Sequence, residues 1–158
     1  MLIWNDVALI HLPRRAKLSR YVMPIELPND CSPNENLDSI VMGFGRTGTN
    51  EPSSIDLRFA SLHTTSIGEC RRQFPFLFLR RSVLCAKSYG SKTQAIAKGD
   101  SGSPLVRTKD NKLIGVGSFS KPNCNQRKPQ AFTNIILYHK WISDITGLEL
   151  PNCKFFSK

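Results

Sequence analysis

Short apolar segments separated by turn residues dominate the chain. Some are compact apolar runs and others alternate apolar with polar residues, and glycine, proline, asparagine or serine stands between them. They cover residues 7–12, 40–44, 55–59, 113–119 and 131–136. A period of two and frequent turn residues are typical of antiparallel strands. The pattern therefore predicts an all-β protein, built as a barrel or a sandwich.

One helix is predicted near the C-terminus. Apolar residues recur there at the spacing of a single helix face, namely Leu137, Trp141, Ile142 and Ile145. Gly147 comes directly after this face and is a natural C-terminal stop, with Pro151 beyond it. We therefore expect an all-β domain that ends in a helix over residues 137–147.

Length and composition favour one folded domain. The chain has 158 residues, of which 40% are hydrophobic and 22% charged, so it has enough apolar material for a core. A membrane-spanning helix needs about 18 or more consecutive apolar residues. The nearest run, residues 74–79, is interrupted by Pro75. We expect no membrane contact.

The chain is basic, with 22 lysines and arginines against 12 aspartates and glutamates, a formal net charge of +10. Such a charge could attract nucleic acid, an acidic surface or an anionic substrate. However, the basic residues come as scattered pairs, at positions 14–15, 71–72 and 80–81, and no run has the length of a nucleic-acid patch. Nucleic acid is therefore not an expected partner.

The cysteine pattern indicates disulfides rather than a metal site. The five cysteines are Cys31, Cys70, Cys85, Cys124 and Cys153. Their spacing contains neither a C-x-x-C pair nor a zinc pattern with histidine, whereas disulfides are common in secreted proteins. Because the count is odd, at least one thiol is free or has its partner outside this sequence. The first residues also lack the features of a signal peptide, so we expect nothing within this sequence to direct export.

The most informative stretch is GDSGSPLV at residues 99–106. A Gly-Asp-Ser-Gly string alone is more often a turn than a site, because each of these residues favours tight turns. Here it occurs with NDVALI at residues 5–10, GFGRTG at 43–48, PQAFT at 129–133 and the helix that carries Trp141. In this order, the segments resemble the trypsin/chymotrypsin family of serine endopeptidases over nearly the whole chain.

The resemblance implies an acyl-transfer site. Ser101 matches the nucleophile, and Asp6 matches the acid that orients the general-base histidine. The backbone N–H groups of Gly99 and Ser101 would stabilise the oxyanion. Asp100 matches the carboxylate that pairs with the new amino terminus made by zymogen cleavage.

The resemblance also implies a fold and a set of partners. It predicts a chymotrypsin-like antiparallel barrel, with residues 26–136 as the C-terminal barrel and 137–147 as the C-terminal helix. Residues 1–25 would carry the last strand of a first barrel and the crossover. Protein or peptide substrates and protease inhibitors are the expected partners. No cofactor and no metal are implied, and family members of this kind are secreted.

The triad histidine has no matching position. It should precede Asp6, and only five residues do so. His11, His63 and His139 do not follow the family's histidine motif, and the family's mature N-terminus is also missing. We therefore expect the C-terminal portion of a peptidase, mostly without the first barrel and inactive by itself. The alternative is a non-catalytic homologue that binds a protein partner.

Other departures concern specificity and cysteine pairing. Ala95 stands at the bottom of the family's primary pocket, and Ser120 and Gln130 stand where small residues keep that pocket open. We expect a pocket for small or apolar side chains, narrowed by Gln130.

The family also suggests how the cysteines pair. Cys70 and Cys85 match a family disulfide. The usual partner of Cys124 is replaced by Ala97, which leaves Cys124 unpaired or rerouted. Cys31 could pair with Cys153 or with a cysteine outside this sequence.

Overall fold

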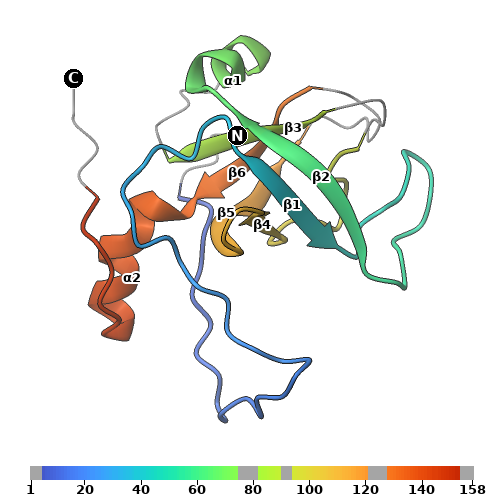
Figure 1. The fold of residues 1–158 in the computed structure, drawn as a ribbon. Coiled ribbons are helices and arrows are strands. Elements are labelled where there is room, and N and C mark those ends of the chain that lie inside the picture. Colours follow the sequence, from blue (N-terminus) through green and yellow to red (C-terminus); the bar gives the residue numbers. More distant parts are fainter. Residues whose placement is uncertain (1–4, 75–81, 90–93, 121–127, 154–158) are drawn as a thin grey trace.

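The computed structural model describes residues 5–74, 82–89, 94–120 and 128–153. Six antiparallel strands close into a barrel in the order β1-β2-β3-β6-β5-β4 (Figure 1). The strands are β1 (Asp38–Gly43), β2 (Arg58–Thr65), β3 (Val83–Ser88), β4 (Pro104–Arg107), β5 (Lys112–Phe119) and β6 (Gln130–Asn134). The all-β barrel with a C-terminal helix, predicted from the sequence, is confirmed.

Alternating side chains of these strands fill the barrel. Leu62, Leu105, Ile114 and Phe132 are fully buried, and each comes from a different strand. A smaller cluster lies between α1 (Ile67–Gln73) and the barrel and surrounds the Cys70–Cys85 disulfide. This disulfide is the one implied by the family resemblance. The core therefore fixes the strands from inside, and the disulfide fastens the helix to β3.

The strands differ from the apolar pattern in informative places. The segments at 40–44 and 113–119 form β1 and β5, but the segment at 131–136 divides because β6 ends at Asn134. Of residues 55–59, only the last two lie in a strand. Residues 7–12 form no strand, and the side chains of Ile10 and Leu12 are exposed. No described strand pairs with them, and an apolar run without a ladder partner cannot form a strand.

The C-terminal helix forms as expected. It begins as a 3-10 turn, η1 (Ile135–Tyr138), and continues as α2 (His139–Thr146). Gly147 has a φ of 74°, in the left-handed region that favours glycine, and its N–H donates to the Ser143 carbonyl at 2.9 Å. α1 was not predicted, and Ser66 begins it by accepting a hydrogen bond from the Glu69 N–H at 3.2 Å.

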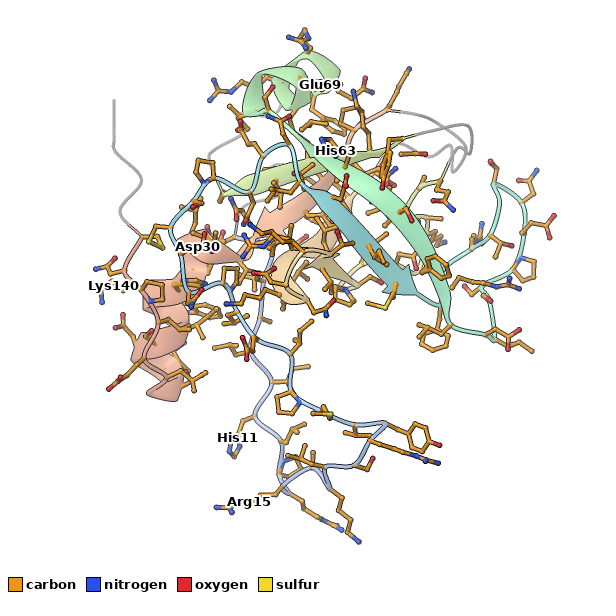
Figure 2. All side chains as sticks on the ribbon, viewed as in Figure 1. His11, Arg15, Asp30, His63, Glu69 and Lys140 are labelled. Atoms are coloured by element: carbon orange, nitrogen blue, oxygen red, sulfur yellow. A yellow bond between two sulfur atoms is a disulfide. The ribbon has the colours of Figure 1, made fainter. Side chains whose placement is uncertain are left out.

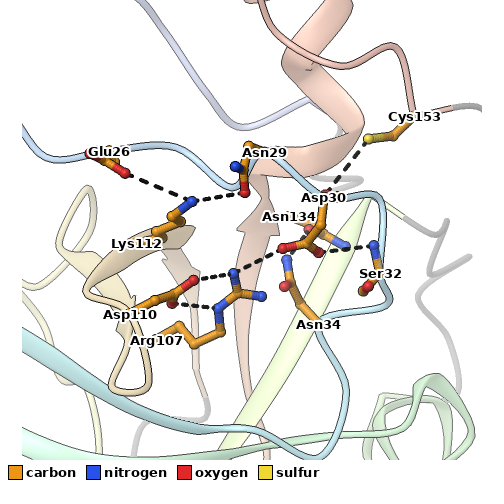
Figure 3. A network of polar contacts seen from close by, with 10 residues as sticks. All are labelled: Glu26, Asn29, Asp30, Ser32, Asn34, Arg107, Asp110, Lys112, Asn134 and Cys153. Atoms are coloured by element: carbon orange, nitrogen blue, oxygen red, sulfur yellow. Dashed lines mark hydrogen bonds and ion pairs between the residues drawn. The ribbon is translucent and has the colours of Figure 1, made fainter.

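A buried arginine joins the segment before β1 to the turn between β4 and β5 (Figure 3). Arg107 donates to both carboxylate oxygens of Asp110 at 2.7 Å and to Asp30 at 3.1 Å. The hydrogen bond to Asp110 raises the pKa of Arg107. Next to Asp30, Cys31 forms a disulfide with Cys153. This pairing resolves one of the alternatives left open by the sequence, while Cys124 lies outside the described residues.

Candidate active site

Ser101 lies at the exposed tip of a tight loop that leads into β4. The Asp100 N–H donates to the Ala97 carbonyl, and the Ser103 N–H donates to the Asp100 carbonyl, both at 3.0 Å. Gly99 has a φ of 101° and Gly102 a φ of 85°, conformations that L side chains rarely adopt. The two glycines therefore permit the turn that presents the Ser101 hydroxyl to solvent.

The loop is fastened to β5 through Gly117. The Gly102 N–H donates to the Gly117 carbonyl, and the Gly117 N–H donates to the Ser103 carbonyl, both at 2.8 Å. A Cβ on Gly117 would lie 2.7 Å from the backbone oxygen of Asp100, which is closer than real Cβ contacts. Glycine is thus required at position 117 for the loop to approach β5.

The backbone N–H groups of Gly99 and Ser101 are available to a ligand. Neither has an acceptor within the described parts of the chain, although the N–H groups of Asp100, Gly102 and Ser103 all do. Unpaired backbone donors at an exposed loop can stabilise a developing negative charge.

The Asp100 carboxylate is turned inward and is not a solvated turn residue. One of its oxygens accepts from the Gly45 N–H at 2.8 Å, and the other accepts from the Ala97 N–H at 2.9 Å. Gly43 and Gly45 leave space for it, because a Cβ at either position would lie within 2.5 Å of a carboxylate oxygen. A cavity of about 210 Å³ lies beside this carboxylate and is also lined by Ala95.

Asp6 and the residue before it contact three elements, namely the strands β5 and β6 and the 3-10 turn η1. Its side chain accepts from the Ser118 hydroxyl of β5 at 2.5 Å, and its backbone carbonyl accepts from the Thr133 hydroxyl of β6 at 2.6 Å. The preceding residue, Asn5, accepts from the Tyr138 hydroxyl at 3.0 Å. These contacts fix an otherwise strandless segment against the barrel.

The same contacts bring Asp6 and Ser101 to one end of β5. Asp6 bonds to Ser118, whose neighbour Gly117 bonds to Gly102, and Gly102 adjoins Ser101. The roles of Ser118 and Gly117 were not predicted from the sequence. No local signal could have found them, because a serine and a glycine in an apolar strand are common.

The three histidines have other surroundings. The Nδ1 atom of His63 lies 2.8 Å from a carboxylate oxygen of Asp38. This pair lies at one end of the β1–β2 ladder, and Gly43 lies at the other end. His11 is exposed on the N-terminal segment, which leads away from the barrel (Figure 2). His139 is fully buried in α2, and burial lowers its pKa. Within the described parts of the chain, none of the three histidines forms a hydrogen bond or an ion pair with Asp6 or Ser101.

Gln130 is buried against residues 94–96, which precede the Ser101 loop. It is 3% exposed, and its side-chain oxygen accepts from the Ile96 N–H at 2.6 Å. Its amide nitrogen donates to the Gln94 carbonyl at 3.4 Å. The Ser120 hydroxyl donates to the Ile96 carbonyl at 3.4 Å. Gln130 therefore contacts the backbone on both sides of Ala95, whereas Ser120 contacts it only at Ile96.

Comparison with known proteins shows which family the chain belongs to. The Trypsin family model matches residues 3–142. The chain is 36% identical to granzyme M of Rattus norvegicus over 151 residues, which is 93% of this chain and 58% of that protein. It is 32% identical to a collagenase of Hypoderma lineatum over 148 residues, 91% of this chain and 55% of that protein.

Solved structures give the same result. Mouse neuropsin, a serine protease, matches with a TM-score of 0.74 and 30% identity, covering 84% of this chain and 57% of that one. The HL collagenase structure matches with a TM-score of 0.74 and 28% identity, covering 87% and 59%. The barrel therefore has the fold of the chymotrypsin-like serine proteases. The chain belongs to the Trypsin family, and it spans little more than half the length of these relatives.

Neither a membrane-crossing helix nor a metal-binding cluster emerges from the part of the chain that the structure describes. No helix there is long and apolar enough to span a bilayer. Its histidine, cysteine, aspartate and glutamate side chains form no group of three that could hold a metal ion.

Proposed function

We propose that this chain carries the nucleophile half of a serine endopeptidase site. Ser101 would attack the carbonyl carbon of a peptide bond, and the N–H groups of Gly99 and Ser101 would stabilise the oxyanion. Asp6 would orient a histidine that accepts the Ser101 proton. The observation that carries this proposal is the contact series from Asp6 through Ser118 and Gly117 to the Ser101 loop.

The proton acceptor itself is not supplied by His11, His63 or His139. His63 contacts Asp38, His139 is buried in α2, and His11 is exposed on the N-terminal segment. Losing the base of a triad lowers turnover roughly a millionfold. By itself, the chain therefore has negligible peptidase activity, and its histidine belongs to a part of the protein outside these residues.

The proposal extends to the organisation of the chain. Residues 26–136 form the C-terminal barrel of a two-barrel peptidase domain and 137–147 its terminal helix. Residues 1–25, whose described part forms no strand here, would provide the last strand of the first barrel and the crossover once the rest of that barrel is present to pair with them. Asp100, whose carboxylate is turned inward, is the partner of an amino terminus made by zymogen cleavage. The substrates are proteins or peptides, protease inhibitors bind the same site, and no cofactor takes part. The two disulfides support secretion.

Cleavage occurs after a substrate residue whose side chain is small or apolar. Ala95 offers no charge for a lysine or arginine, and the buried Gln130 side chain, which bonds to the backbone on both sides of Ala95, would narrow the pocket. A peptide panel on the complete protein tests this proposal. Strong preference for lysine or arginine would contradict it.

Exogenous imidazole tests whether Asp6 and Ser101 flank a base. The folded chain is treated with a serine-reactive phosphonate, with and without imidazole. We expect negligible labelling without imidazole, and labelling at least about tenfold faster with it, below the 10²–10⁴ of a positioned base. Ser101→Ala abolishes labelling, and Asp6→Asn removes most of the imidazole response. Rapid labelling without imidazole would show that the chain has its own base.

A second candidate function is a non-catalytic module that binds a protein partner. It is favoured by the surroundings of the three histidines and by the buried Gln130 side chain. This candidate predicts that a folded chain shows no imidazole response at Ser101. Clear labelling of Ser101 would exclude it.

A further inference from the structure

A long exposed connection joins the segment that carries Asp6 to the barrel. Residues 8–26 are all exposed, and they form a loop that extends away from the barrel and returns to it (Figure 1). Within the described parts of the chain, the backbone of residues 8–18 forms no hydrogen bond. Exposed loops of this kind are preferred sites of proteolytic cleavage, because a peptidase binds its substrate as an extended strand. The connection is therefore open to a peptidase while the barrel stays folded.

Two adjacent arginines lie on this connection. Arg14 and Arg15 are exposed, and neither has a hydrogen bond or an ion pair within the described residues. Figure 2 shows Arg15 far from the barrel, near the end of the loop. Each free guanidinium can form a bidentate ion pair with a carboxylate of an approaching enzyme. The pair therefore adds a means of recognition to a backbone that is already accessible.

The chain contains two other arginine pairs, and they differ from this one. The pair at residues 71–72 lies in α1, whose backbone is hydrogen-bonded and which the Cys70–Cys85 disulfide fastens to β3. A peptidase can bind that pair as a strand only after the helix has opened. The pair at residues 80–81 lies outside the described residues. Of the two pairs that the structure describes, only the one at 14–15 combines free arginines with a backbone that is ready for binding.

We propose that the Arg15–Ala16 bond is a processing site for a separate endopeptidase that recognises paired basic residues. One water molecule adds across the peptide bond, so that Arg15 gains a carboxylate and Ala16 gains an amino group. No other bond forms or breaks. The cut leaves Asp6 and Ser101 on separate chains, and it therefore acts as an off switch for the site. This consequence rests on the proposed function, whereas the cleavage itself does not.

Few contacts hold residues 1–15 to the barrel after such a cut. No cysteine lies among them, so no disulfide retains them. In the described part of the chain, their hydrogen bonds to the barrel half are those that Asn5 and Asp6 accept from three hydroxyl groups. A free peptide of 15 residues loses conformational entropy when it is held in one conformation, which opposes these few bonds. We therefore expect the cut to release the peptide that contains Asp6.

Limited proteolysis of the full chain tests the site. A kexin-type endopeptidase, which cleaves after paired basic residues, is added to the folded chain, and the products are identified by mass spectrometry over time. We expect the first cut after Arg15, at least about tenfold faster than a cut after Arg72, because the helix opens only part of the time. A first cut after Arg72 or Arg81, or no cut at all, would overturn the proposal.

Three variants separate recognition of the pair from general charge. Arg15→Gln should abolish the first cut and leave folding unchanged, because the side chain is exposed and without a partner. Arg72→Gln is the matched change in another pair and should keep the cut. Lys17→Gln removes a neighbouring exposed charge and should leave the rate nearly unchanged. If Lys17→Gln slows the cut as much as Arg15→Gln does, the enzyme recognises charge rather than the pair, and the proposal is wrong.

The cleaved chain distinguishes this inference from the proposed peptidase function. Size-exclusion chromatography after the cut should separate residues 1–15 from the barrel, and the imidazole-dependent labelling of Ser101 should fall to the level of Asp6→Asn. A peptide that stays bound would refute the release. If the intact chain shows no imidazole response, the proposed function is wrong. The position of the cut and the release of the peptide would still decide the present inference, because neither depends on labelling.

Discussion

The Ser118 hydroxyl donates a 2.5 Å hydrogen bond to the Asp6 carboxylate, across 112 residues of sequence. Asp6 lies on a segment without strand pairing, whereas Ser118 lies in the closed barrel. The carboxylate therefore takes its position from a side chain of the barrel, with the Thr133 hydroxyl fixing its backbone. This arrangement makes the geometry of the site sensitive to a single hydroxyl.

Ser118→Ala should weaken the site without unfolding the chain. The residue is only partly buried, so losing its hydroxyl leaves the barrel intact, but the Asp6 carboxylate becomes free to rotate. We expect the imidazole-dependent labelling of Ser101 to fall about tenfold, which corresponds to the lower end of the roughly 1.5–3 kcal/mol of a hydrogen bond to a charged group. Ser54→Ala removes an exposed hydroxyl that bonds to the Asp56 backbone and serves as the control. Equal rates in the two variants would contradict the positioning role.

Two glycine substitutions should have opposite effects on stability. In Gly45→Ala, the new Cβ would lie 2.4 Å from the carboxylate carbon of Asp100, so we expect a loss of about 1–3 kcal/mol as for other overpacked sites. Gly68 lies within α1, and a Cβ there would be 3.8 Å from the Ser66 hydroxyl oxygen, the nearest atom outside the adjoining residues and the helix backbone. Gly68→Ala should therefore stabilise the helix by about 0.5–1 kcal/mol. Urea unfolding measures both changes. A Gly45→Ala chain as stable as the wild type would show that Asp100 is not held as described.

The sequence predicts most of the fold because its apolar residues alternate where strands have partners. The period of two locates β1 and β5, and Gly147 marks the end of α2. Residues 7–12 have the apolar content of a strand but form none. The sequence pattern shows that content, but it does not show whether a strand is present to pair with the segment. α1 has only seven residues, too few for a helical period, yet Ser66 and Glu69 have the spacing of a capping box.

Some residues of the candidate site could be predicted from the sequence, and others could not. The glycines around Ser101 are readable because left-handed turns require glycine locally, as Gly99 and Gly102 do here. The roles of Ser118 and Gly117 cannot be predicted from the sequence, because they depend on residues that only the closed barrel brings together. Long-range contacts leave no local pattern, so they require the folded structure.

Gln130→Ala should open space beside residues 94–96 and lower the stability of the chain. The substitution removes the acceptor of the Ile96 N–H, at a cost of about 1–3 kcal/mol for an unpaired buried donor. We expect phosphonates with larger side chains to label Ser101 faster, relative to small ones, in the presence of imidazole. Ser120→Ala loses only a 3.4 Å hydrogen bond and should leave this ratio nearly unchanged. The same ratio in Gln130→Ala and wild type would exclude a role in selectivity.

His139 should make the fold sensitive to mild acid. Burial lowers its pKa below the ordinary value of 6.5, although the Pro151 carbonyl and the Asp30 carboxylate favour the charged form. The unfolded chain therefore takes up a proton first as the pH falls below about 6.5, which favours unfolding. Asp30 and Asp110 have pKa values below 3.8, so their contribution is lost only at lower pH.

Thermal unfolding between pH 7.5 and pH 5 measures this effect. We expect the melting temperature of the wild type to decrease over this range and that of His139→Leu to decrease less, because leucine takes up no proton. His11→Gln changes an exposed histidine and should keep the wild-type dependence. If His139→Leu loses stability with acid as steeply as the wild type, the buried imidazole is not the group that takes up the proton on unfolding.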